Sequence, residues 1–189
     1  MGKNYKDILH KKYEAFSVEE NPIKRKLLRM EIHSILRNVD TLDSEDFYIW
    51  GLTFYMSSED KLYDTNLALE NFIKSYELDS DNFLACLYVA HCFHDTKDWF
   101  NALSFYEKVN QQKLKEFQVW RYVKLIEHIG YCHYKLGNKE IGRQKFEKVL
   151  AWYKKSELGE LAVPTEIIEC LEESDSIVKE IKKIEDYLK

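Results

Sequence analysis

The side chains best suited to chemistry lie in one stretch of the sequence that is rich in histidine and cysteine. His91 and His94 are three residues apart, so on a helix they would share a face and could bind one metal ion. Cys86 lies five residues before His91, and Cys92 would point to another face of the same helix. Because no third ligand completes the set, the sequence predicts no metal site.

A second group of residues raises the question of nucleophilic catalysis. A thiol beside an imidazole is the minimum for thiol chemistry, and His128, Cys132 and His133 provide both groups. No glycine-rich turn that could stabilise an oxyanion or cradle a phosphate lies near them. The chain also lacks the Gly-x-Ser-x-Gly, His-Glu-x-x-His and EF-hand patterns. We therefore expect no catalytic residues and no cofactor, and an enzyme is a less favoured class of protein.

The composition indicates a helical protein with a sizeable hydrophobic core. Hydrophobic residues make up 45% of the 189 residues, which is enough to exclude wholesale disorder, and the length favours a single domain. Six glycines and two prolines are too few for the many turns of an all-β sandwich or barrel. Long helices are therefore the expected elements.

Charge and hydropathy argue against two kinds of partner. The formal net charge is −5 and no basic stripe is visible, so we expect no nucleic acid to bind. No apolar run approaches the roughly 20 residues that span a membrane, and the polar N-terminus contains no apolar signal core. With no export signal, the four widely spaced cysteines are expected to be reduced thiols of a cytoplasmic protein.

Apolar residues at helical spacing predict flanking helices at both ends of the chain. Asn21 is a capping residue and Pro22 suits the first position of the helix that follows. Barely two heptads are present in the last helix, which favours a cap over a coiled coil. We predict helices at 4–17, 22–39 and 45–57, a polar loop at 57–61, a helix that starts at Pro164, and a last helix, capped by Ser174 or Asp175, that carries Ile177, Ile181, Ile184 and Leu188.

A repeated pattern runs through the middle of the chain. Each repeated unit contains two small residues, which let two helices approach closely. The aromatic residue four positions after the second small residue would fill the gap beside that residue. One helix pair cannot bury its apolar face alone, so stacked pairs are expected to share a core with Ala102 fully buried. Cys92 and Cys132 are equivalent positions and should be small buried thiols. The pattern recurs 40 positions later (130 − 90), where Ala90, Phe93, Ala102, Tyr106 and Val109 correspond to Gly130, His133, Gly142, Phe146 and Val149. An earlier unit lies 34 positions before (102 − 68), where Ala68, Phe72 and Ser75 correspond to Ala102, Tyr106 and Val109.

This pattern resembles the tetratricopeptide repeat (TPR) family, most clearly where Lys97-Asp98-Trp99 separates the two small residues Ala90 and Ala102. Gly142 stands where the family usually has alanine, and His133 replaces an aromatic residue. The resemblance covers about residues 44–156 and implies an all-α, right-handed stack of antiparallel helix pairs, a TPR-like α-solenoid with N- and C-terminal flanking or capping helices. The expected organisation is a single domain, 1–189, with an N-terminal helix pair at 1–42, repeats at 44–82, 83–117 and 118–156, and C-terminal capping helices at 160–189.

The resemblance also implies a concave groove, lined by the first helix of each pair, that binds a protein or peptide. The expected lining is rich in tyrosine, which offers a large contact area with few rotatable bonds. The alternative is that the flanking helices fold into the groove and bury these rings. The candidate partner-binding residues are Tyr48, Leu52, Tyr55, Leu87, His91, His94, Asp95, Glu127, Tyr131 and Tyr134.

The sequence therefore predicts a non-enzymatic protein–protein interaction module, as a monomer or weak dimer. No binding of heat-shock-chaperone tails is expected, because Tyr48 and Leu52 occupy places of the family's carboxylate clamp and His128 replaces its arginine, although Lys124 matches. A dedicated partner-keeper, such as a bacterial secretion chaperone or a toxin-immunity protein, is the alternative. An enzyme or a self-assembling structural subunit is less favoured.

Overall fold

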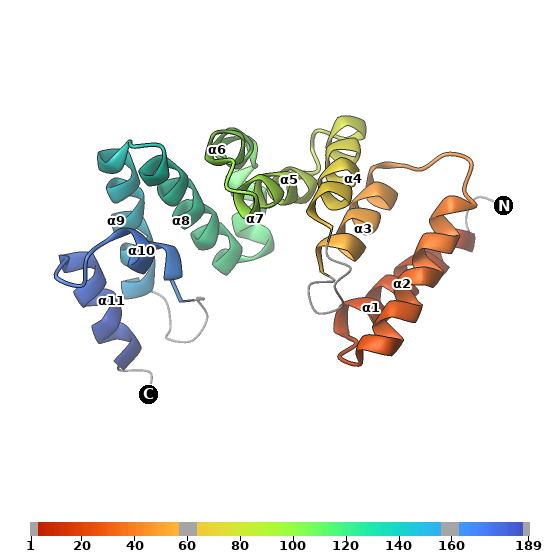
Figure 1. The fold of residues 1–189 in the computed structure, drawn as a ribbon, viewed down its shortest axis with the longest axis horizontal. Helices are drawn as coiled ribbons and strands as arrows, with labels where there is room; N and C mark the ends of the chain where they lie inside the picture. Colours follow the sequence, from red (N-terminus) through yellow and green to blue (C-terminus); the bar gives the residue numbers. More distant parts are fainter. Residues whose placement is uncertain (1–3, 57–63, 156–162, 187–189) are drawn as a thin grey trace. The chain divides into compact units, whose positions relative to one another are not determined.

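The computed structural model describes residues 4–56, 64–155 and 163–186, and every regular element within these ranges is a helix (Figure 1). The predicted loop at 57–61 and the end of the last helix at Leu188 lie outside the described residues. The helices are α1 (Asn4–Val18), α2 (Pro22–Arg37), α3 (Ser44–Tyr55), α4 (Thr65–Leu78), α5 (Phe83–Asp95), α6 (Trp99–Lys108), α7 (Gln111–Phe117), α8 (Val119–Lys135), α9 (Lys139–Lys155), α10 (Thr165–Cys170) and α11 (Ser176–Asp186).

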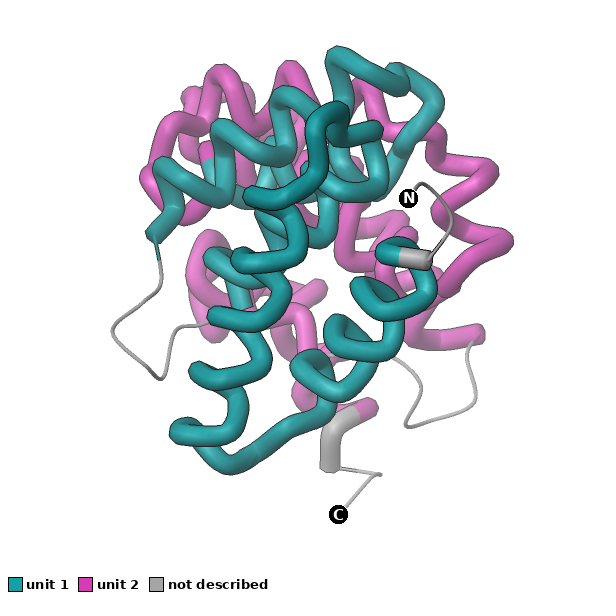
Figure 2. Tube along the Cα trace, turned by 90° about the vertical axis from the view of Figure 1, so that its right-hand side faces the viewer, with its two compact units in different colours: residues 1–92 teal, residues 93–189 magenta. Residues whose placement is uncertain are grey.

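The chain divides into two compact units, unit 1 from Met1 to Cys92 and unit 2 from Phe93 to Lys189 (Figure 2). The boundary falls within α5, so this helix contributes residues to both units. That the whole chain behaves as a single domain remains a prediction.

In unit 1, α1 and α2 pack as a pair and α2 also contacts α3. The side-chain oxygen of Asn21 accepts hydrogen bonds from the backbone N–H groups of Ile23 and Lys24, which confirms the predicted start of α2. The helix ends at Arg37 rather than at Val39, because the N–H of Asn38 bonds back to the carbonyls of the last turn. The core of this region is formed by Leu9, Phe16, Ile32, Leu36 and Ile49.

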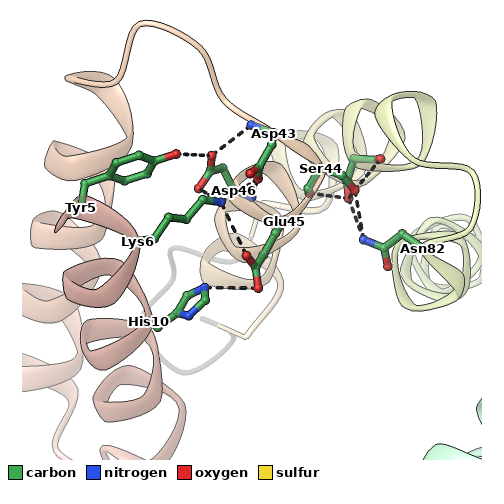
Figure 3. A network of polar contacts seen from close by, with 9 residues as sticks. Tyr5, Lys6, His10, Asp43, Ser44, Glu45, Asp46 and Asn82 are labelled. Carbon is green, nitrogen blue, oxygen red and sulfur yellow. Dashed lines mark hydrogen bonds and ion pairs between the residues drawn. The ribbon is translucent and has the colours of Figure 1, made fainter. Parts of the chain in front are cut away.

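A polar network fastens α1 to the start of α3 (Figure 3). Asp46 is fully buried, and its carboxylate accepts hydrogen bonds from the Tyr5 hydroxyl at 3.0 Å and the Lys6 ammonium at 2.8 Å. Lys6 also pairs with Asp43 at 2.7 Å. Asp43 and Asp46 form a capping box, each accepting the backbone N–H of the other. The N-terminal pair is therefore joined to the first repeat by a buried charge as well as by apolar packing.

Close approach of α3 and α4 depends on Gly51. A β-carbon added there would lie 2.6 Å from the ring of Phe72, so no larger residue fits without a shift. In unit 2 the helix hairpin α8–α9 repeats this contact: a β-carbon added to Gly130 would lie 2.8 Å from the ring of Phe146. The aromatic residue was expected beside the second small residue of its unit; in the structure it lies against the first small residue, Gly51 or Gly130, on the facing helix.

The turns before α6 and α9 are also equivalent. Lys97, with φ of 62°, and Gly137, with φ of 88°, are the described residues with positive φ, and they lie 40 positions apart (137 − 97). Asp98 N–H bonds to the carbonyl of Phe93, and Asn138 N–H makes the equivalent bond to His133. Ala102, Cys92 and Cys132 are fully buried, as predicted.

The rest of unit 2 packs around α8 and α9. Helices α6, α7 and α10 contact α8, and α11 contacts α9, where its Ile177 and Ile181 are buried. Asp175 accepts the N–H of Ile177 and starts α11, as the sequence indicated. The helix α7 was not predicted; it lies at the end of the predicted second repeat, 83–117, and Asn110 caps it. No helix in the described part of the chain combines the length and apolar character that crossing a bilayer requires.

Candidate binding surface

Two of the predicted groove residues of unit 2, Glu127 and Tyr131, lie on a surface of α8 that a short helix of the same chain covers. We call this surface the α8 face and define it by Glu127, His128, Tyr131 and Lys135. The covering helix, α10, is six residues long and lies on α8 with Ile167 completely buried in the core. Its acidic residues Glu166 and Glu169 are three apart and therefore share the side that meets the α8 face.

Glu127 lies at the start of this contact. The residue is 1% exposed; one oxygen of its carboxylate accepts the backbone N–H of Glu166 at 3.0 Å and the other accepts from Lys124 at 2.9 Å. Burial raises the pKa of the Glu127 carboxyl, and the pairing with Lys124 opposes that effect. The residue is thus committed to contacts inside the protein.

The side chain of Glu166 meets two imidazoles. Its carboxylate lies 2.8 Å from Nδ1 of His128 and 3.1 Å from Nε2 of His94, which belongs to the last turn of α5. Burial alone would raise the pKa of Glu166, but the contacts with His128 and His94 outweigh burial and hold the pKa well below its usual range. Aromatic rings enclose the imidazoles, with Tyr106 stacked on His128 and Trp99 edge-on to His94.

Glu169 makes the outer contact of α10. One of its carboxylate oxygens accepts hydrogen bonds from the Tyr131 hydroxyl and from the Lys135 ammonium, each at 2.8 Å. Burial and the bond to Glu169 raise the pKa of Tyr131 to about 12, so the phenol remains a donor across the physiological range. The α8 face therefore binds a short acidic helix through a carboxylate, an imidazole, a phenol and an ammonium group.

Unit 1 contains the other part of the predicted surface, as a cluster of aromatic rings. Tyr88 lies at its centre, with ring centroids 5.8 Å from Tyr48, 5.3 Å from Tyr55, 5.1 Å from Phe72 and 5.6 Å from His91. Tyr48, Tyr55 and His91 are half-buried, and Leu52 and Leu87 are buried at 2% exposure. The rings form one continuous cluster within unit 1.

The predicted residues thus divide between the two units. Within unit 2, Glu127 and Tyr131 are buried and contact α10, His94 lies beside Glu166, and Asp95 is exposed. Tyr134 is placed differently: its β-carbon would lie 3.2 Å from a β-carbon on Gly142, and its ring packs on Phe146. It is part of the packing between α8 and α9.

Sequence reasoning missed Tyr88, Glu166 and Glu169. Tyr88 lies off the stripe of positions that the repeat family uses for its groove. Two glutamates three apart, beside an isoleucine in a short segment, are the signal that could have identified α10 as a segment docked on its own protein. Cys132, considered above as a nucleophile, is fully buried, and burial with the nearby Glu166 raises its pKa to about 12.

Comparisons with known proteins bear on the fold. No protein-family model matches the sequence, and no curated protein is significantly similar to it. A solved structure described as the crystal structure of MamA protein has a TM-score of 0.61 at 18% identity and covers 84% of this chain and 78% of that one. A second MamA structure has a TM-score of 0.51 at 17% identity, covering 80% and 85%. MamA is a TPR-like helical solenoid, so the likeness confirms an all-α, TPR-like α-solenoid fold for this chain.

Proposed function

We propose that this protein is a non-enzymatic protein-interaction module. The proposed binding residues are those of the first helices of the helix pairs: Tyr48, Leu52, Tyr55, Leu87 and His91 in unit 1, and His94, Asp95, Glu127, Tyr131 and Tyr134 in unit 2. The observation that carries the proposal is the docking of α10, since the α8 face already recognises a short acidic helix through directed polar contacts. A surface that does so within the chain has the chemistry to do so for a partner.

The aromatic cluster of unit 1 supports the same proposal. Tyrosine is enriched among the residues that dominate binding energy, because it provides a large apolar area with a polar tip. Tyr48 and Tyr55 are half-buried, so neither residue is fully closed off from solvent. The chemistry of α10 indicates that the partner segment is acidic and helical, with carboxylates one turn apart.

The α8 face can be tested with a peptide of residues 163–173. The variant Glu166→Lys/Glu169→Lys places positive charge against His94, His128 and Lys135 and should release α10 from the surface. A labelled peptide with the native sequence should then bind this variant in trans, measured by fluorescence anisotropy. The same peptide with glutamine at both glutamate positions should bind at least about tenfold more weakly, a difference of about 1.4 kcal/mol.

The partner itself is tested by co-purification from the source cells, followed by mass spectrometry. Tyr55→Ala should lose a partner that the wild type recovers stoichiometrically. Phe100→Ala is the matched control, because Phe100 is an aromatic residue at 72% exposure on α6, outside both surfaces. Equal recovery by both variants, together with no peptide binding to the released α8 face, would contradict the proposal.

A further inference from the structure

Three metal-ligating side chains from three helices converge on one point of unit 2. His94 comes from the end of α5, His128 from α8 and Glu166 from the first turn of α10, and their ligand atoms all lie within 4.8 Å of one another. One oxygen of Glu166 is 2.8 Å from Nδ1 of His128 and 3.1 Å from Nε2 of His94. Donor atoms around a tetrahedral zinc, with bonds of about 2.0–2.1 Å, lie roughly 3.3 Å apart. Small side-chain movements would therefore fit an ion between these atoms.

One of these ligand atoms, Nε2 of His94, lacks a well-formed hydrogen bond within the described part of the protein. Nε2 of His94 is buried and makes no hydrogen bond of good geometry with the described residues; its one polar contact among them is the ion pair with Glu166 at 3.1 Å. Buried polar atoms are nearly always paired, and an exception calls for a ligand or another explanation. The three side chains are only 15%, 11% and 12% exposed, in the order His94, His128 and Glu166. A bound cation would satisfy Nε2 of His94 with better geometry than this ion pair does.

The surroundings hold the three groups in place. The ring of Tyr106 stacks on His128 with centroids 5.3 Å apart and planes 9° from parallel, and Trp99 packs edge-on against His94 at 5.1 Å. The backbone of Glu166 is held by its hydrogen bond to Glu127. Ligands that neighbouring groups orient in advance bind a metal more tightly than mobile ones.

We propose that His94, His128 and Glu166 bind a divalent transition-metal ion of the zinc class, which fastens α10 to α8 and to the end of α5. Two imidazoles and one carboxylate suit Zn²⁺, Co²⁺ or Ni²⁺, whereas Mg²⁺ and Ca²⁺ prefer oxygen ligands alone. The sequence predicted no such site because His91 and His94 lacked a third ligand on their own helix. In the structure His91 packs on Tyr88 in unit 1. The other two candidate ligands near His94 come from α8 and α10 instead.

The test is metal titration of the full chain after treatment with EDTA, in a buffer with a phosphine reductant. Calorimetry with Zn²⁺ should give one equivalent bound. Co²⁺ should give the visible spectrum of a tetrahedral site without the charge-transfer band of thiolate ligands. His94→Gln, His128→Gln and Glu166→Gln should each weaken Zn²⁺ binding by at least about tenfold, because even groups that only orient a ligand change affinity by about 10–100-fold.

Two histidines provide matched controls. His91 lies on the same helix as His94, and His133 lies on the same helix as His128. The variants His91→Gln and His133→Gln should both keep the wild-type affinity for Zn²⁺. Circular dichroism melting in EDTA shows whether each variant folds. If a histidine variant does not, Glu166→Gln and the Co²⁺ spectrum of the wild type decide the matter, because neither removes a ring from the core. The proposal is overturned by absence of saturable Zn²⁺ binding, by a thiolate spectrum, or by unchanged affinity in folded ligand variants.

Discussion

The buried carboxylate of Glu127 accepts the backbone N–H of Glu166, 39 residues later in the chain, at 3.0 Å. Helix α10 follows Pro164, whose side chain makes no capping hydrogen bond, so the helix has no cap of its own. The first N–H groups of a helix need acceptors, and a residue of α8 provides one here. Docking on α8 and formation of α10 are therefore coupled.

Replacing Glu127 by alanine should release α10. The change leaves the Glu166 N–H and the Lys124 ammonium without their acceptor, at a cost of about 1–3 kcal/mol. Cys170 reports the result, because it lies at the end of α10 and burial raises its pKa to about 12. Once α10 is released, the thiol should ionise more readily and react several-fold faster with a thiol reagent.

Glu70→Ala is the control for this experiment, since Glu70 is an exposed glutamate on α4 in the other unit. Its thiol reactivity should equal that of the wild type. Cys86, Cys92 and Cys132 are buried and should stay protected in both variants. An unchanged rate for Cys170 in Glu127→Ala would show that α10 is held independently of this hydrogen bond.

The paired turns at Lys97 and Gly137 predict opposite effects of two substitutions. A left-handed conformation costs an ordinary residue about 1–2 kcal/mol, and glycine avoids most of this cost. Lys97→Gly should therefore raise the free energy of unfolding by up to about 1 kcal/mol. Gly137→Ala should lower it by about 1 kcal/mol through conformation alone, because no atom lies within 4 Å of the added β-carbon. Urea unfolding at neutral pH measures both; two changes of the same sign would refute the equivalence of the turns.

Features that repeat along the chain or depend on neighbouring residues were predictable from the sequence. The 40-residue period placed Ala102, Cys92 and Cys132 in the core, because small buried residues recur wherever helices pack in the same way. The capping residue Asn21 located the start of α2, since a cap acts on the neighbouring residues alone. Local and periodic signals therefore predicted the helices and their pairing.

The docking of α10 was not predictable by the same means. A helix of six residues is too short to show a period, and Glu166 and Glu169 read as solvated acids until their partners are known. Those partners lie 38 residues away in α8. Tyr88 was missed for a related reason, because the family pattern assigns its position to no groove contact. Contacts between distant segments depend on the tertiary fold, and they leave no local pattern in a single sequence.

A methyl group added at Gly51 should destabilise the pair of α3 and α4. The new β-carbon would meet the Phe72 ring at 2.6 Å, and overpacking of this kind costs about 1–3 kcal/mol. This loss opposes the gain of about 1 kcal/mol that alanine gives over glycine within a helix. Gly51→Ala should therefore show a lower melting temperature in spite of its better helix propensity.

The cause is checked by a double-mutant cycle with Phe72→Leu. Leucine removes the ring atoms that the added β-carbon would meet, so Gly51→Ala should cost less in the Phe72→Leu background. A coupling energy of about 0.5–3 kcal/mol is expected for residues in direct contact. Strictly additive effects would mean that the two residues do not limit each other.

The network around Lys6 predicts how stability depends on acid. Burial would raise the pKa of Asp43, but hydrogen bonds from Lys6 and from the backbone of Asp46 outweigh it and lower the pKa from its ordinary 3.8. A carboxyl whose pKa is lower in the folded state stabilises the protein above its unfolded pKa. That contribution is lost as the pH falls below about 3.8 toward the folded pKa.

Asp43→Asn should isolate this contribution, because asparagine also caps helices and keeps the bond to the Asp46 N–H. The variant should be less stable than the wild type at pH 7, and the difference in unfolding free energy should shrink as the pH is lowered from 7 past about 3.8, with most of the loss below 3.8. Urea unfolding across this range provides the measurement, with the exposed Asp40→Asn as control. If the difference stayed constant with pH, the charge of Asp43 would contribute nothing to holding α1 against α3, and Lys6 would be held there by Asp46 at 2.8 Å and Glu45 at 3.5 Å.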